Sequence, residues 1–307
     1  MMKTLILNVL LLLVCSSSIA ASHNKLLYLN EYDLDGNGEV NQSEFEQGRK
    51  QRFDATDENH NGLVDENEYV FEYQNRMDKQ LSEDRFERVK QAVARFKSLD
   101  KSDNQHIEWQ EYQASGERNF KQFDTHQDSI VNHLDRKPEN SSDVVNTTDK
   151  TPQQIEGAKN RLLQQAKRLL HMPTTHTSSG FFKKYDVDEN ASITKAEFDK
   201  VRLADFTRID EDKNGWLSEQ EYLFEYENRL DQEIARTRKG AIKQTHVRFN
   251  ILDDDKNAQM TFAEYQLSGH RSFKRWDTNE DGIVSMLDPM PKERSNDEQN
   301  NTTDAAK

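Results

Sequence analysis

Apolar residues are sparse in this chain, and many of them recur at fixed positions around eight short acidic segments. A phenylalanine stands four residues before seven of these segments, and Leu29 takes the same place before the first. A second apolar or aromatic residue directly precedes every segment except the one that begins at Asp57. Positions three or four apart share one face of an α-helix. The spacing therefore predicts a helix before each acidic segment, with its apolar face in a small core.

Each acidic segment is twelve residues long and presents oxygen-bearing side chains at regular intervals. The first runs from Asp33 to Glu44, with Asp35 at position 3, Asn37 at position 5 and Gly38 at position 6. This pattern resembles the calcium loop of the EF-hand family, in which positions 1, 3 and 5 supply side-chain oxygens, position 7 a backbone carbonyl and position 12 a bidentate carboxylate. Position 9 often contacts the ion through water. Position 6 requires a left-handed backbone, which glycine adopts most readily.

Seven further loops follow the same pattern and begin at Asp57, Asp100, Asp124, Asp186, Asp210, Asp253 and Asp277. All eight loops place an apolar residue at position 8, where the loops of this family pair through a short β contact. These residues are Val40, Val64, Ile107, Val131, Ile193, Leu217, Met260 and Val284. We therefore expect an all-α fold of helix-loop-helix repeats with short β contacts between loops.

The chain consists of two similar halves, because residues 69–73 recur at 222–226 and residues 115–121 recur at 268–274, with the same displacement along the chain in both cases. Each half carries four loops, which predicts two EF-hand modules. The expected modules are residues 21–138 with loops 33–44, 57–68, 100–111 and 124–135, and residues 179–291 with loops 186–197, 210–221, 253–264 and 277–288.

Between the modules, residues 139–178 are expected to form a linker that contains an amphipathic helix at 152–172. That helix either covers one module or acts as an internal ligand in a groove opened by calcium. Residues 292–307 are polar and are expected to be a disordered tail.

The intervals between loops predict which of them pair. Successive loop starts are separated by a short, a long and a short interval in both halves. The short interval leaves one helix of about 18 Å between two loops, which keeps them apart. The long interval leaves room for a helix, a linker and a second helix. We therefore predict four pairs: 57–68 with 100–111, 33–44 with 124–135, 210–221 with 253–264, and 186–197 with 277–288.

Three loops match the ligand pattern most fully, with Glu39, Leu63 and Trp216 acting through their backbone carbonyls. Their predicted metal ligands are Asp33, Asp35, Asn37, Glu39 and Glu44; Asp57, Asn59, Asn61, Leu63, Asp65 and Glu68; and Asp210, Asp212, Asn214, Trp216 and Glu221. Two more loops have Ala191 or Ala258 at position 6 but keep the ligands Asp186, Asp188, Asn190 and Glu197, or Asp253, Asp255, Asn257 and Glu264. The left-handed alanine costs about 1–2 kcal/mol, so we expect binding there to be about tenfold weaker.

The remaining loops depart further from the pattern. One loop has Gln105 at position 6, and its candidate ligands are Asp100, Ser102, Asn104 and Glu111. Another loop ends in a shorter carboxylate, which suits weak binding of calcium or magnesium, and its candidate ligands are Asp277, Asn279, Asp281 and Asp288. The loop at Asp124 carries His126 at position 3 and Ser129 at position 6, and we expect it to be structural only. The sequence thus predicts five to seven competent calcium sites.

The close loop spacing within each half is similar to that of the lanmodulin-like periplasmic EF-hand proteins, which bind lanthanide ions. The proline that those proteins carry at position 2 is absent here. The residues at that position are Leu34, Glu58, Lys101, Thr125, Val187, Glu211, Asp254 and Thr278. We therefore do not expect selectivity for lanthanides, and magnesium and lanthanide ions are weaker alternatives to calcium.

The N-terminus has the form of a secretory signal peptide over residues 1–20. Lys3 precedes an apolar run at 5–14, and Ser18-Ile19-Ala20 has the form of a cleavage site. The single cysteine, Cys15, lies in this segment, so the mature chain would have no disulfide. We expect a secreted or periplasmic protein.

Composition narrows the function further. The chain has 56 acidic against 42 basic residues and a net charge of −14, which argues against binding to nucleic acid or, after cleavage, to membranes. The histidines are scattered and no catalytic motif is present, so we do not expect an enzyme. Two functions stay open: a calcium buffer or calcium-stabilised structural binder, and a sensor or adaptor that recruits a protein partner. The few, scattered methionines favour the first.

Overall fold

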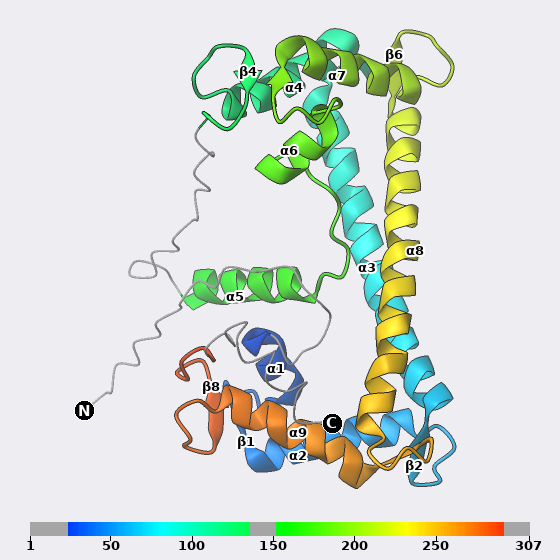
Figure 1. Ribbon diagram of the computed structural model, residues 1–307, viewed down its shortest axis with the longest axis vertical. Helices are drawn as coiled ribbons and strands as arrows, with labels where there is room; N and C mark the ends of the chain where they lie inside the picture. The colour runs from blue at the N-terminus through cyan, green and yellow to red at the C-terminus, as the bar shows by residue number, and fades with distance from the viewer. Residues whose placement is uncertain (1–23, 136–151, 292–307) are drawn as a thin grey trace, which may run out of the picture. The chain divides into compact units, whose positions relative to one another are not determined.

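The computed structural model describes residues 24–135 and 152–291, which are mainly α-helical with short antiparallel strand pairs, as expected for the fold class (Figure 1). The expected signal peptide, the residues 139–151 of the expected linker and the expected tail lie outside the described residues. Within the described part of the chain, no helix has both the length and the apolar character that a membrane crossing requires.

Helices and strands follow the same order in both halves of the chain. The first half contains α1 (Lys25–Tyr32), β1 (Glu39–Asn41), α2 (Gln42–Thr56), β2 (Leu63–Asp65), α3 (Glu66–Leu99), β3 (His106–Glu108), α4 (Trp109–Phe123) and β4 (Ile130–Val131). After α5 (Pro152–Lys167), the second half contains α6 (Ser178–Tyr185), β5 (Ile193–Thr194), α7 (Lys195–Ile209), β6 (Trp216–Ser218), α8 (Glu219–Leu252), β7 (Gln259–Thr261), α9 (Phe262–Trp276) and β8 (Ile283–Ser285). Among the described residues, no helix begins directly at the end of the fourth loop of either half.

The acidic loops themselves define where the helices begin and end. The backbone N–H of Asp57 donates to the carbonyl of Phe53 (3.0 Å) and closes α2, and the first residue of every other loop ends its helix in the same way. At the far end of the loop, Thr261 and Glu264 form a capping box that begins α9. Positions 9 and 12 of a loop therefore also cap the helix that follows it.

The long interval between the second and third loops of each half is one uninterrupted helix, not the expected helix, linker and helix. Helix α3 covers all 34 residues from Glu66 to Leu99, and α8 covers the equivalent residues of the second half. No proline or glycine interrupts α3, and α8 contains the single Gly240, so local propensity favours continuation. In the described residues, the strands of the second and third loops of one half are not paired with each other.

Loops instead pair between the two halves of the chain. Strand β1 pairs antiparallel with β8, β2 with β7, β3 with β6 and β4 with β5. The expected contact at position 8 is confirmed, with Val40 opposite Val284 and Val131 opposite Ile193. The four predicted pairs, 57–68 with 100–111, 33–44 with 124–135, 210–221 with 253–264 and 186–197 with 277–288, are wrong because each assumed partners within one half.

The chain forms two compact units, and each combines segments of both halves. The described part of the first unit is residues 24–77, 152–167 and 240–291; that of the second is residues 78–135 and 168–239. These units differ from the expected modules, which followed chain order. The first unit holds loops 33–44, 57–68, 253–264 and 277–288, and the second holds loops 100–111, 124–135, 186–197 and 210–221.

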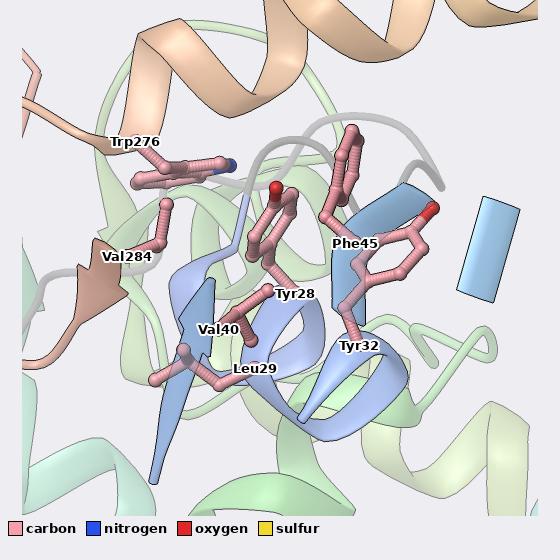
Figure 2. Packing of buried hydrophobic residues seen from close by; sticks show 7 residues of the cluster. All are labelled: Tyr28, Leu29, Tyr32, Val40, Phe45, Trp276 and Val284. Carbon is pink, nitrogen blue, oxygen red and sulfur yellow. The ribbon is translucent and has the colours of Figure 1, made fainter. Parts of the chain in front are cut away.

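Small aromatic clusters form the cores of both units. In the first unit, Figure 2 shows Phe45 beside Tyr28 and Tyr32, with ring centroids 5.6 and 4.7 Å away. Trp276 and Val284 complete this cluster from the second half of the chain. The residues predicted four positions before the loops are buried in six cases, and Phe182 and Phe273 pack against clusters while partly exposed.

Helix α5 is shorter than the expected helix at 152–172, because it ends at Lys167. The backbone N–H groups of Leu169 and Leu170 donate instead to the Asp84 carboxylate of α3, at 2.7 and 3.1 Å. Arg88 donates to the carbonyl of Leu170 (3.0 Å), whose side chain is fully buried in the second unit. These tertiary contacts end the helix before Pro173. Helix α5 itself packs against α1 in the first unit.

Candidate metal sites

Hydrogen bonds within each loop hold its first seven residues in a tight curl. The Asp57 carboxylate accepts the backbone N–H of Gly62 (2.8 Å), and the side-chain oxygen of Asn61 accepts the N–H of Leu63 (2.8 Å). The same two contacts, from position 6 to position 1 and from position 7 to position 5, recur in all eight loops. The polar side chains that the sequence singled out therefore also build the loop.

The predicted left-handed backbone at position 6 is confirmed in every loop. Its φ is 91° at Gly215 and 62° at Ala191, so residues with a side chain adopt it as well. Position 4 is also left-handed in all eight loops, with φ of 74° at Gly36 and 59° at Glu280. This second left-handed position was not predicted, because the residues there include histidine, glutamine, lysine and glutamate, which carry no common signal.

Three carboxylates converge in each of four loops. In each of these, positions 1, 3 and 12 offer oxygen atoms that lie within 4.8 Å of one another. The groups are Asp33, Asp35 and Glu44; Asp186, Asp188 and Glu197; Asp210, Asp212 and Glu221; and Asp253, Asp255 and Glu264. Both loops with alanine at position 6 are among them.

The other loops replace one of these carboxylates. In loop 57–68, Asn59 at position 3 donates from its amide to Glu68 (2.7 Å), and in loop 100–111 the hydroxyl of Ser102 donates to Glu111 (3.0 Å). The Asp65 carboxylate accepts the N–H of Glu68 (2.9 Å) and so caps α3. In these two loops the predicted ligands are close to one another but bring fewer negative charges together.

The two most divergent loops end in aspartate. In loop 277–288 the backbone N–H of Thr278 donates to the Asp288 carboxylate (3.1 Å). In loop 124–135, Nδ1 of His126 lies 3.3 Å from Oδ1 of Asp135. Loop 124–135, expected to be structural, lies beside loop 186–197 through the β4 and β5 pair.

The position 12 carboxylate accepts hydrogen bonds from its own loop. One of its oxygens accepts the backbone N–H of position 9, as from Ser218 to Glu221 (2.9 Å). Its other oxygen accepts an N–H from position 2 or 3, as from Glu211 to Glu221 (2.9 Å). Burial raises the pKa of Glu221, but the Ser218 side chain and the backbone donors outweigh it, so the pKa lies below its ordinary value. The pKa values of Glu111 and Glu264 are lowered in the same way by their own donors.

The first loop differs, because two of its buried carboxylate oxygens have no hydrogen-bond donor. These atoms are Oδ1 of Asp33 and Oε1 of Glu44, at positions 1 and 12. A buried carboxylate oxygen without a donor or a cation is unfavourable. The donor set at this site, carboxylates and an amide without histidine or cysteine, fits a hard divalent cation such as calcium or magnesium.

Comparison of the chain with known protein families, with curated proteins and with solved structures finds no match in any of the three. The assignment of a function therefore depends on the geometry of the loops.

Proposed function

We propose that this chain is a secreted or periplasmic calcium-binding protein with EF-hand loops, which buffers calcium or is stabilised by it. The observation that carries the proposal is the convergence of three carboxylates, at the same three positions, in four separate loops. Carboxylates repel one another at such distances unless a cation or hydrogen-bond donors stand between them. The two donor-free oxygens of Asp33 and Glu44 support a cation in the first loop.

The chemistry of each loop favours a calcium-sized ion. Positions 1, 3, 5 and 12 offer side-chain oxygens, and position 7 offers a backbone carbonyl, which suits the six to eight oxygen ligands that calcium takes. Five to seven sites are expected to be competent, with loop 124–135 the expected exception. About six calcium ions would bring twelve positive charges to a chain of net charge −14 and so relieve most of its self-repulsion. Binding and stability are therefore expected to rise together.

Calorimetric titration of metal-free residues 21–307 with calcium tests the proposal, with five to seven sites expected. Glu44→Gln and Glu221→Gln each remove one position 12 carboxylate and should each remove one site. Glu83→Gln is the matched control, because Glu83 is an exposed residue of α3 outside the loops, and it should leave the count unchanged. Absence of heat and of saturation at millimolar calcium would refute the calcium assignment, and parallel titrations with magnesium and a lanthanide would identify those alternatives.

A second candidate function, a calcium-dependent adaptor, is favoured by one pair of residues. Phe71 on α3 and Phe224 on α8 occupy equivalent positions of the two halves and are 52% and 58% exposed. Exposed rings at matching sites could contact a protein partner. A calcium-dependent rise in the fluorescence of a dye that binds apolar surface, reduced by Phe71→Ser and Phe224→Ser, would support the adaptor. Unchanged dye fluorescence would leave the buffer or structural binder as the proposal.

A further inference from the structure

We infer that each half of the chain carries a self-complementary surface, so that a half can pair with the same half of a second copy of this chain. The first repeat is residues 24–135 and the second repeat is residues 178–291.

Strand pairing shows that the two units repeat the same contact with the roles of the repeats exchanged. The displacement that relates the two halves turns β1 into β5 and β4 into β8, so the β1–β8 pair of the first unit is equivalent to the β5–β4 pair of the second. The β2–β7 pair is likewise equivalent to the β6–β3 pair. Each repeat thus presents its first and second loops to the fourth and third loops of its partner.

A buried arginine makes the same contacts in both units. In the first unit, Arg49 on α2 donates to the carbonyl of Tyr265 and the hydroxyl of Ser268, and its guanidinium lies 3.5 Å from the centroid of the Tyr265 ring. Helices α2 and α9 come from different repeats, and the guanidinium of Arg49 therefore joins them.

The equivalent contact in the second unit uses the same residue types. Arg202 on α7 donates to the carbonyl of Tyr112 and the hydroxyl of Ser115, and it lies 4.1 Å from the Tyr112 ring centroid. Arg49 is 5% exposed and Arg202 is 8% exposed, so each charge depends on these acceptors.

A glycine makes room for each arginine. A Cβ atom on Gly269 would lie 2.7 Å from Nε of Arg49, and a Cβ atom on Gly116 would overlap Nε of Arg202. Both glycines are in helices, so they are needed for close approach and not for an unusual backbone. This explains the Ser-Gly pair that recurs at 115–116 and 268–269.

Aromatic contacts follow the same symmetry. Phe53 lies 5.8 Å from Tyr265 in the first unit, and Phe206 lies 5.5 Å from Tyr112 in the second, between ring centroids. The residue types agree at these contacts, so there a repeat meets on its partner the same groups that it presents itself. Elsewhere in the cores the types differ, since Tyr28 and Trp276 of the first unit correspond to Phe181 and Phe123 of the second. Such a contact is isologous, and it is the kind that forms symmetric dimers.

The differences between the units favour the mixed pair without excluding pairs of like repeats. Lys195 lies 3.7 Å from Glu117 in the second unit, and the equivalent residues of the first unit are Gln42 and His270. Pairing of like repeats would set Gln42 against Glu117 or Lys195 against His270. Neither combination brings two carboxylates or two ammonium groups together.

The test uses the full chain with a protease site inserted at residues 140–147. After cleavage of the folded protein, the two halves should stay together as a 1:1 complex in native mass spectrometry. On incubation, dimers of the first repeat and dimers of the second repeat should also form, and their masses distinguish them from the mixed dimer. Two halves that separate as monomers, or a mixed dimer that never exchanges into dimers of like repeats, would overturn the inference.

Two variants distinguish the three dimers, because a side chain at Gly116 or Gly269 blocks only the contacts that this glycine makes with an arginine of the partner repeat. Gly116→Leu affects one contact of the mixed dimer, both contacts of the first-repeat dimer and none of the second-repeat dimer. Overpacking of this kind weakens association about tenfold per contact, hence about a hundredfold for the dimer with two. Gly269→Leu should give the mirror result. Equal loss of all three dimers would overturn the inference.

Discussion

Replacement of Arg49 by methionine tests the energetic account of the first unit. The substitution keeps much of the apolar stem but removes the guanidinium that donates to Tyr265 and Ser268. Hydrogen bonds from a charged group contribute about 1.5–3 kcal/mol, and the stacked cation adds about 0.5–2 kcal/mol. Part of this is offset because the variant no longer buries a charge. We expect the free energy of unfolding of the first unit to fall by about 2–4 kcal/mol.

Urea unfolding followed by tryptophan fluorescence would measure the loss, because Trp276 belongs to the first unit and is 1% exposed. Arg49→Lys keeps the charge but not the planar fork, and should recover less than half of the stability. Arg236→Met is the matched control, since that arginine is exposed and forms an i,i+3 ion pair on α8. A change below about 0.5 kcal/mol for Arg49→Met, within the range of ordinary surface substitutions, would refute the reasoning.

Leu170→Ala should lower the free energy of unfolding of the second unit, measured in urea, by about 2–5 kcal/mol, because the Leu170 side chain is fully buried. The Leu169 side chain is less buried, so Leu169→Ala should cost less, and equal losses would contradict this. Chelation should lower the thermal unfolding temperature, since each site filled at a hundred times its Kd contributes about 2.7 kcal/mol, and an unchanged temperature would argue against binding. The pKa values of Glu111, Glu221 and Glu264 are lower in the folded state than in the unfolded state, so at about pH 4 to 5 the unfolded chain binds more protons. The urea midpoint of the metal-free protein should therefore fall as the pH drops below about 5. A variant with glutamine at all three positions should show a smaller fall.

The local features of the loops could be predicted from the sequence because they depend on residues close together in the chain. The oxygen-bearing side chains at positions 1, 5 and 12 and the left-handed position 6 all act within a single loop. The further roles of these side chains, as acceptors of backbone N–H groups and as a helix cap, were not predicted. Even Ala191 and Ala258 adopt the conformation that the loop requires. The left-handed backbone at position 4 was not predicted, because the residue types found there share no preference for it.

The prediction named the correct positions of the paired loops within a repeat, but it placed both partners in the same repeat. The interval argument expected second loops to pair with third loops and first with fourth, and these ranks do pair, as in Val64 with Met260 and Val40 with Val284. The partner belongs to the other repeat because α3 and α8 continue without a turn. The prediction of two helices in the long stretch between the second and third loops followed from its length, although that stretch has no proline and only Gly240 as a glycine.

By itself, therefore, the sequence determined the acidic loops, the helices that flank them, the apolar side chain through which each loop pairs and the duplication that relates the two halves. These follow from side-chain chemistry and helical periodicity over short distances. Only the tertiary structure decided which loops meet, where α5 ends and why Gly116 and Gly269 stand where they do. Each of these depends on a partner far away in the chain, such as Asp84 for Leu170 or Arg202 for Gly116, whose position no local pattern encodes.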